Sequence, residues 1–255
     1  MLNLIRLLLF FSFIVLQACQ QRAQNTENTQ KLKEAASYNT QLGIAYLKQG
    51  DSVRAKHKLL TALDLAPDSP DVNVAMAYYF EKTGDTKEAR TYYQKALSLA
   101  PGSGAQLNNY GTFLCRLGEY KEAESYFLKA VKDVHYIYTA GAYENAGLCA
   151  AAIPDYPKAK YYFSKALNQD PQRKQSLYEL VKIELGQHHA VKALFYLQRY
   201  PELTLEDLSL LSLAIKVAHT ANKPDAESVY KQRLSQLNPF TDYTGAKHEY
   251  NNNNG

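Results

Sequence analysis

The sequence predicts an all-α protein built from tandem helix-turn-helix units of about 34 residues. Small residues recur at this step, because Gly43, Ala77 and Gly111 lie 34 residues apart and Gly147 follows after 36. Two further columns of alanine keep the same register: Ala55, Ala89, Ala123 and Ala159, and Ala62, Ala96, Ala130 and Ala166. Separate columns with one shared step indicate a repeat array, in which each unit packs on its neighbours.

Each column has a physical reason. A Gly or Ala in the first helix of a unit, facing the first Ala of the second helix, lets the two helix axes approach closely. The turn between the two helices contains a glycine followed by an acid, which suits a positive φ and a new helix start; these pairs are Gly50-Asp51, Gly84-Asp85 and Gly118-Glu119, with Pro154-Asp155 in the fourth unit. Pro67, Pro101 and Pro171 end the first, second and fourth units, since proline cannot continue a helix.

The boundaries follow from these columns. Four units are clear, over residues 36–69, 70–103, 104–137 and 140–173. The extra residues fall in Val134–Tyr138, which also lacks the closing proline, so we expect a longer loop there. Leu180, Ala193, Leu197 and Pro201 keep enough register for a fifth unit, 174–204. A sixth unit, 205–238, would contain helices over 205–221 and 225–237, and we expect 239–255 to be a disordered tail.

The aromatic residue or leucine between the two alanines, which is Leu59, Tyr93, Phe127 or Phe163, makes each unit resemble the tetratricopeptide repeat. The resemblance implies a superhelix whose inner wall is lined by the first helix of every unit. Its mixture of apolar, amide and separated charged groups suits a peptide or protein segment and disfavours a phosphate ligand. The wall positions are Thr40, Ile44, Leu47 and Lys48; Val74, Tyr78, Glu81 and Lys82; Asn108, Thr112, Cys115 and Arg116; and Glu144, Leu148 and Ala151.

The N-terminus looks like a targeting segment. An apolar run over 7–16 follows one cationic residue, Arg6, and is too short to span a bilayer of about 30 Å. It ends in Leu16-Gln17-Ala18-Cys19, which resembles a bacterial lipobox. That resemblance implies a signal peptide over 1–18 and a diacylated, palmitate-type Cys19, with a polar tether over 19–35. Gln20, where inner-membrane retention has Asp, favours the periplasmic face of the outer membrane. A plain secretory signal or a short N-terminal membrane helix remains the alternative.

Composition and motifs narrow the function classes. The chain has 255 residues, 46% hydrophobic and 21% charged, as expected for a folded protein. The net charge of +4 is spread without a basic stripe, which excludes a nucleic-acid surface. His188 and His189 are adjacent, so they point about 100° apart on a helix and fit exposed turn residues better than metal ligands. We find no phosphate loop, nucleophile elbow or zinc-protease motif, and expect no catalysis, cofactor or small-molecule substrate. Acidic side chains are expected to be solvated.

Cys115 and Cys149 lie in the second half of the first helix in neighbouring units. An oxidising compartment would favour a disulfide between them, since each has only the other as partner once Cys19 carries lipid. They are 34 residues apart where the unit offset is 36, so they occupy positions two apart in their helices. Two buried, small hydrophobic thiols are the alternative.

Lipobox, tether and about six repeats together resemble the type IV pilus biogenesis and stability lipoproteins called PilF or PilW. The resemblance is sharpest in Leu107–Cys115 and Gly118–Tyr120, continues at Glu122-Ala123 and Phe127, and recurs in Glu144–Cys149. It implies a pilotin, a lipoprotein that binds the outer-membrane secretin and promotes its delivery and assembly. The alternatives are a tetratricopeptide-repeat adaptor of another envelope machine, or an enzyme with a repeat domain, which has too few residues left for a catalytic domain.

Overall fold

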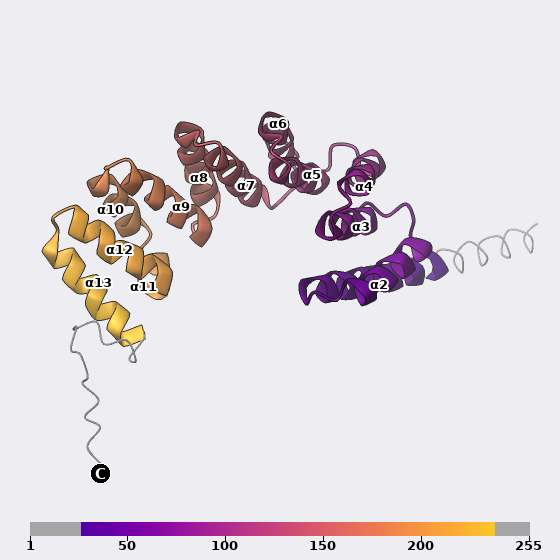
Figure 1. Ribbon diagram of the computed structural model, residues 1–255, viewed down its shortest axis with the longest axis horizontal. Coiled ribbons are helices and arrows are strands. Elements are labelled where there is room, and N and C mark those ends of the chain that lie inside the picture. The colour runs from indigo at the N-terminus through magenta and orange to yellow at the C-terminus, as the bar shows by residue number, and fades with distance from the viewer. Residues whose placement is uncertain (1–26, 238–255) are drawn as a thin grey trace, which may run out of the picture. The chain divides into compact units, whose positions relative to one another are not determined.

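The computed structural model describes residues 27–237, and within that range it contains helices and no strand (Figure 1). The predicted signal peptide, Cys19 and the tail over 239–255 therefore lie outside the described residues. Contacts divide the chain into two compact units, one ending at Tyr110 and one beginning at Gly111. No described helix has the length and apolar content that crossing a bilayer requires.

The first unit contains two helix pairs and the start of a third. A helix over 27–48 pairs with α2 (Ser52–Leu65), and α3 (Pro70–Thr83) pairs with α4 (Thr86–Leu99). The helix α5 (Gly104–Arg116) begins in this unit and continues into the second. The end of the first predicted repeat and both bounds of the second, 70–103, match these helices, whereas the first helix begins before residue 36.

The second unit continues the same alternation and then departs from it. The regular part contains α6 (Tyr120–Ala130), α7 (Thr139–Ala152), α8 (Tyr156–Gln169), α9 (Lys174–Gly186) and α10 (Ala190–Arg199). A short helix α11 (Pro201–Glu206) precedes the last pair, α12 (Leu208–Thr220) and α13 (Pro224–Leu237). The all-α repeat prediction is confirmed.

The small-residue columns are explained by close helix contacts. A Cβ placed on Gly147 would lie 2.6 Å from the ring of Phe163, and one on Gly43 would lie 2.6 Å from Leu59. Both distances are far inside van der Waals contact, so a side chain at either glycine would push the two helices of its repeat apart. All eight column alanines are fully buried.

The turns between paired helices also follow the sequence pattern. Gly50, Gly84 and Gly118 have φ between +81° and +89°, in the left-handed region that glycine tolerates. The following acid then caps the next helix, because the carboxylates of Asp51, Asp85 and Asp155 accept the amides of Arg54, Glu88 and Lys158.

Two boundary predictions are wrong. The polar tether is expected to reach residue 35, yet the helix already begins at 27. Its exposed first turns are helped by side chains four residues apart, where Lys31 pairs with Glu27 at 2.7 Å and Gln30 donates to Glu34 at 2.8 Å. A polar stretch without an apolar stripe can therefore still extend a packed helix.

The second error concerns the fifth and sixth units. Pro201 is expected to close the fifth unit, but it is the first residue of α11, a position that proline favours. The sixth pair then begins at Leu208 and not at Leu205, because the Asp207 carboxylate accepts the amides of Ser209 and Leu210 and caps α12. The expected long loop over 134–138 is confirmed, since α6 ends at Ala130 and α7 begins at Thr139.

Candidate protein-binding surface

In the first unit the predicted wall side chains lie on one face of the first helix of each repeat, where they are neither buried nor fully solvated. They are Thr40, Ile44 and Leu47, Val74, Tyr78 and Glu81, and Asn108. Partial exposure at a spacing of three and four residues is what a contact face needs, because it leaves surface that a partner can cover. Lys48 and Lys82 at the ends of this face are exposed.

Several of these side chains are already held in place. Ile44 and Leu47 pack against a core cluster of Ala55, Leu59, Ala75, Met76 and Tyr79, so they are partly core residues. The ammonium of Lys82 lies 5.3 Å from the centre of the Tyr78 ring, a cation–π contact, and Glu81 accepts the hydroxyl of Tyr93 at 3.1 Å. The face is thus preorganised, which lowers the entropy that a partner must overcome.

A cavity of about 760 Å³ opens beside Thr40. It lies between the first helix and the α2–α3 connection, and its walls include Leu32, Ala36 and Val72. Leu32 comes from the stretch that the sequence assigned to the tether. The sequence signal that was available is the spacing of Leu32 and Ala36, four residues apart and therefore on one helical face.

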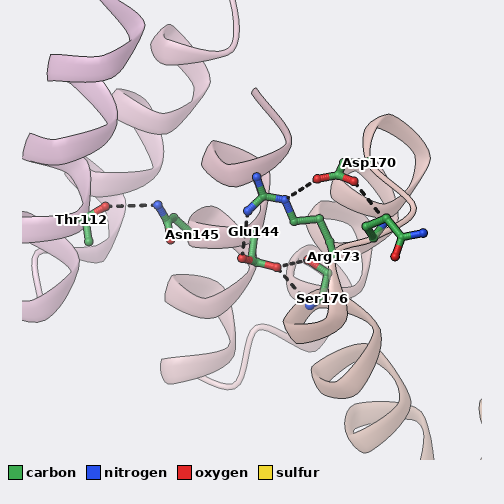
Figure 2. A network of polar contacts seen from close by, with 7 residues as sticks. Thr112, Glu144, Asn145, Asp170, Arg173 and Ser176 are labelled. Atoms are coloured by element: carbon green, nitrogen blue, oxygen red, sulfur yellow. Dashed lines mark hydrogen bonds and ion pairs between the residues drawn. The ribbon is translucent and has the colours of Figure 1, made fainter. Parts of the chain in front are cut away.

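In the second unit a hydrogen bond links the wall helices of two neighbouring repeats. Asn145 of α7 donates to the hydroxyl of Thr112 of α5 at 3.4 Å, which joins the third repeat to the fourth (Figure 2). Arg116 and Leu148 are exposed, and Ala151 is partly exposed. Asn145 was not among the predicted wall residues, although it stands next to Glu144.

Glu144 is the centre of a network that joins the fourth repeat to the fifth (Figure 2). Its carboxylate accepts the amide of Ser176 at 3.1 Å and the hydroxyl of Ser176 at 2.8 Å, and it pairs with Arg173 at 3.4 Å. Arg173 also pairs with Asp170 at 3.0 Å. Glu144 was predicted to face a ligand, and the structure places it in an interrepeat contact, with little carboxylate surface left for a partner.

The two cysteines within the described residues are joined. Cys115 of α5 and Cys149 of α7 form a disulfide with a Cα–Cα distance of 5.8 Å, inside the usual range for such bonds. Cys115 therefore presents no thiol on the wall. The disulfide and the Thr112–Asn145 hydrogen bond connect the same two helices, so this junction between repeats is held by a covalent bond and a hydrogen bond.

A buried carboxylate in the fifth repeat was missed. Glu184 is fully buried, and its oxygens lie 2.9 Å from Lys192 and His189 and 3.4 Å from Lys160. Burial alone would raise the pKa of Glu184, but the hydrogen bonds from Lys192 and His189 and the charge of Lys160 outweigh burial and lower it. His188 and His189 are exposed at the turn, as expected, yet His189 also contacts this acid.

The Glu184 cluster ties α8, α9 and α10 together, and its cations neutralise the acid. Among residues 27–237, no three His, Cys, Asp or Glu side chains gather in a way that could hold a metal ion.

Comparison with known proteins gives the family. The tetratricopeptide-repeat model matches residues 40–104 and 111–174. The type IV pilus assembly protein PilF of Pseudomonas aeruginosa is 30% identical over 217 residues, which covers 85% of this chain and 86% of that protein.

Solved structures agree with the sequence match. The structure of PilF from Pseudomonas aeruginosa has a TM-score of 0.65 at 29% identity, covering 83% of this chain and 95% of that one. PilW, described as a widely conserved type IV pilus biogenesis factor, has a TM-score of 0.64 at 26% identity, covering 81% and 95%. The chain therefore belongs to the PilF/PilW family of tetratricopeptide-repeat proteins of type IV pilus biogenesis.

Proposed function

We propose that this protein is a pilotin, a lipid-anchored scaffold that binds the type IV pilus secretin and promotes its assembly in the outer membrane. The observation that carries the proposal is the match to PilF, which runs across 85% of the chain and so extends beyond residues 40–104 and 111–174, where the repeat model matches. A scaffold role agrees with a surface of preorganised helix faces, because such faces bind extended or helical segments of a partner.

The binding face that we propose is the first-helix wall, represented in the first unit by Tyr78 and Asn108. Both side chains are partly exposed, and they present an aromatic ring and an amide, which are common contact groups in protein interfaces. Aromatic residues at the centre of a contact often contribute most of the affinity. Capture of the secretin should therefore depend on this pair.

The test is a binding measurement between purified full chain and purified secretin. Replacing Tyr78→Ala together with Asn108→Ala should weaken binding by about 1–3 kcal/mol and leave helical content unchanged. The matched control is Tyr161→Ala with Asn168→Ala on α8, where both residues are exposed and Lys165 lies 5.5 Å from the Tyr161 ring, much as Lys82 lies over Tyr78.

The possible outcomes distinguish an error in the binding face from an error in the proposed function. If the Tyr78/Asn108 variant binds like the control, the binding face lies elsewhere on the protein. If the unaltered chain does not bind the secretin, the pilotin function is wrong, and an adaptor for another envelope machine becomes the better proposal.

The membrane anchor is a separate part of the proposal. Its support is the segment Leu16-Gln17-Ala18-Cys19, and a lipid on Cys19 would hold the protein on the periplasmic face of the outer membrane. Cys19→Ser should remain unprocessed or leave the outer-membrane fraction. A wild-type mass that shows no acyl chain would contradict the membrane anchor. It would have no bearing on the proposed binding of the secretin.

A further inference from the structure

The α6–α7 loop, residues 131–138, exposes large apolar side chains. Val134 is 89% exposed, Ile137 80% and Tyr138 63%. Such values mean that no neighbouring wall covers these side chains, so they stand out from the surface and do not line a groove. Contiguous exposed apolar groups of this kind mark a contact with another macromolecule or with a membrane.

The other connections between regular repeats show that this composition is not a requirement of the fold. Residues 66–69, 100–103 and 170–173 each join two repeats with four residues, and the second of the four is proline in each case. None of them contains a large aliphatic or aromatic residue. The apolar composition of the α6–α7 loop is therefore additional to what the repeat requires.

The loop is also held in shape. Asp133 accepts the amide of His135 through its carboxylate at 3.0 Å and the amide of Tyr136 through its carbonyl at 3.1 Å. Tyr136 is partly buried, and its ring lies 6.1 Å from that of Tyr138 in an edge contact. These contacts present Val134 and Ile137 outward in a fixed turn, so a partner need not order them first.

The charges at the base of the loop favour one occupant. Lys129 and Lys132 are exposed in the last turn of α6 and directly after it, while the nearby acid, Asp133, is engaged with the loop backbone. An apolar tip above a cationic base fits an anionic phospholipid surface, because the aliphatic groups enter the interface while the ammonium groups stay with the phosphates. Tyr138 adds an aromatic ring with a polar end, which suits the boundary between lipid headgroups and acyl chains.

We propose that the α6–α7 loop is a membrane-contact site that inserts Val134, Ile137 and Tyr138 into the headgroup region of an anionic bilayer. The site is distinct from the first-helix wall and does not require an acyl chain on Cys19. It would act as a second attachment that fixes how the repeat domain meets the membrane, since a tether alone leaves the orientation free.

The chain contains no tryptophan, so the fluorescence of a single introduced tryptophan reports on one known position. We would place it at Ile137→Trp in the full chain and, as a matched control, at Val191→Trp on α10, which is 66% exposed and belongs to the same compact unit. Any attachment through the N-terminus is common to both variants. Vesicles of phosphatidylethanolamine and phosphatidylglycerol, with and without brominated acyl chains, are the probe.

The proposal expects a blue shift of emission and quenching by brominated lipid for Ile137→Trp and neither effect for Val191→Trp. Adding Lys129→Glu and Lys132→Glu should reduce the vesicle-induced shift of the loop tryptophan. Circular dichroism of every variant checks that the fold is kept.

Four results would overturn the proposal. Loop emission that stays at its solvent value with vesicles would do so, and a shift seen only on adding purified secretin would identify a protein contact instead. Equal shifts for both tryptophans would indicate general adsorption of the domain. A shift that survives both lysine replacements would remove the anionic surface as the occupant.

Discussion

The connections between repeats are of two kinds, and they are held together differently. All three short ones have proline, and two of them also have a local polar clamp. In 66–69 the buried Asn73 donates to the carbonyls of Pro67 and Ser69 at 2.9 and 2.8 Å, and in 170–173 Arg173 pairs with Asp170 and Glu144. The long one, 131–138, has no proline, and the disulfide joins α7, which follows it, to α5, the first helix of the preceding repeat.

The difference teaches that a repeat junction needs a restraint but not a particular kind of restraint. Proline limits the backbone angles of the connection before folding, whereas a disulfide limits the distance between two helices. The long loop is thereby free to vary in length and composition. Substitutions at each kind of connection can test that division, beginning with the largest expected effect.

Replacing Cys115→Ala together with Cys149→Ala should lower the free energy of unfolding by about 3–4 kcal/mol, the chain-entropy value for a loop of this size. Urea unfolding measures the loss, and hydrogen exchange should locate it as faster opening around 131–139. Reduced wild-type protein should behave like the variant. Slower or unchanged exchange at this junction would mean that the disulfide is not its main restraint.

Asn73→Ala should lower the free energy of unfolding by about 2 kcal/mol, because the carbonyls of Pro67 and Ser69 in the short α2–α3 connection lose the donor that the buried Asn73 side chain supplies. Asn39→Ala is the matched control. The Asn39 amide donates to Ala35 within one turn of a half-exposed helix, so its removal should cost well under half as much. Equal losses would show that Asn73 stabilises its own helix and not the connection.

Glu144→Gln should lower stability by about 1–2 kcal/mol, since the neutral amide weakens the contacts with Ser176 and Arg173 across the α8–α9 connection. Glu179→Gln is a close control, with a side chain 17% exposed against 15% for Glu144 and an ion pair to Lys182 within its own helix. Thermal unfolding of both variants at neutral pH compares them. A larger loss in the control would contradict the role given to Glu144.

Acid should weaken the fifth repeat through Glu184. Because the pKa of Glu184 in the folded protein is lowered, its ionised form stabilises the fold above the ordinary value of about 4.5, and the contribution disappears as the pH falls through the folded pKa. The free energy of unfolding of the wild type should therefore exceed that of Glu184→Gln by about 1 kcal/mol at neutral pH, and the two values should converge in acid. A difference between the two proteins that stays constant throughout the acid titration would assign the effect to shape and not to charge.

Val134→Ser with Ile137→Ser should leave the free energy of unfolding within about 0.5 kcal/mol of wild type, because these side chains are exposed and contribute no buried area. Urea unfolding is the measurement. The same pair is expected to matter for vesicle binding. A loss above about 1 kcal/mol would mean that the loop side chains pack on the domain.

The structural features that could be predicted from the sequence are those whose physical constraint recurs in every repeat. The contact of Gly147 with Phe163 recurs with other residues at Gly43 and Leu59, so the need for a small residue produces a column that one sequence can reveal. The disulfide partners could be named for a similar reason, since two cysteines in adjacent repeats have few alternatives. The extent of the wall followed from the same register.

The features that the sequence did not reveal occur at a single position, or depend on contacts with several side chains at once. Proline serves equally well after one helix and at the start of the next, so Pro201 did not reveal α11. Glu184 looks like any helix acid until Lys160, Lys192 and His189 are placed around it. Likewise, Glu144 occupies a wall position, and its capture by Ser176 and Arg173 depends on the geometry of the next repeat.

The disulfide also has a mechanical consequence. A cross-link between Cys115 and Cys149 encloses 34 residue steps, including all of α6 and the apolar loop, within a closed covalent ring. When the chain is pulled from its two ends, tension passes through the sulfur atoms and not through that ring. On full extension about 120 Å of contour length stays hidden until the bond is reduced, so a force–extension trace would report the redox state of this one junction.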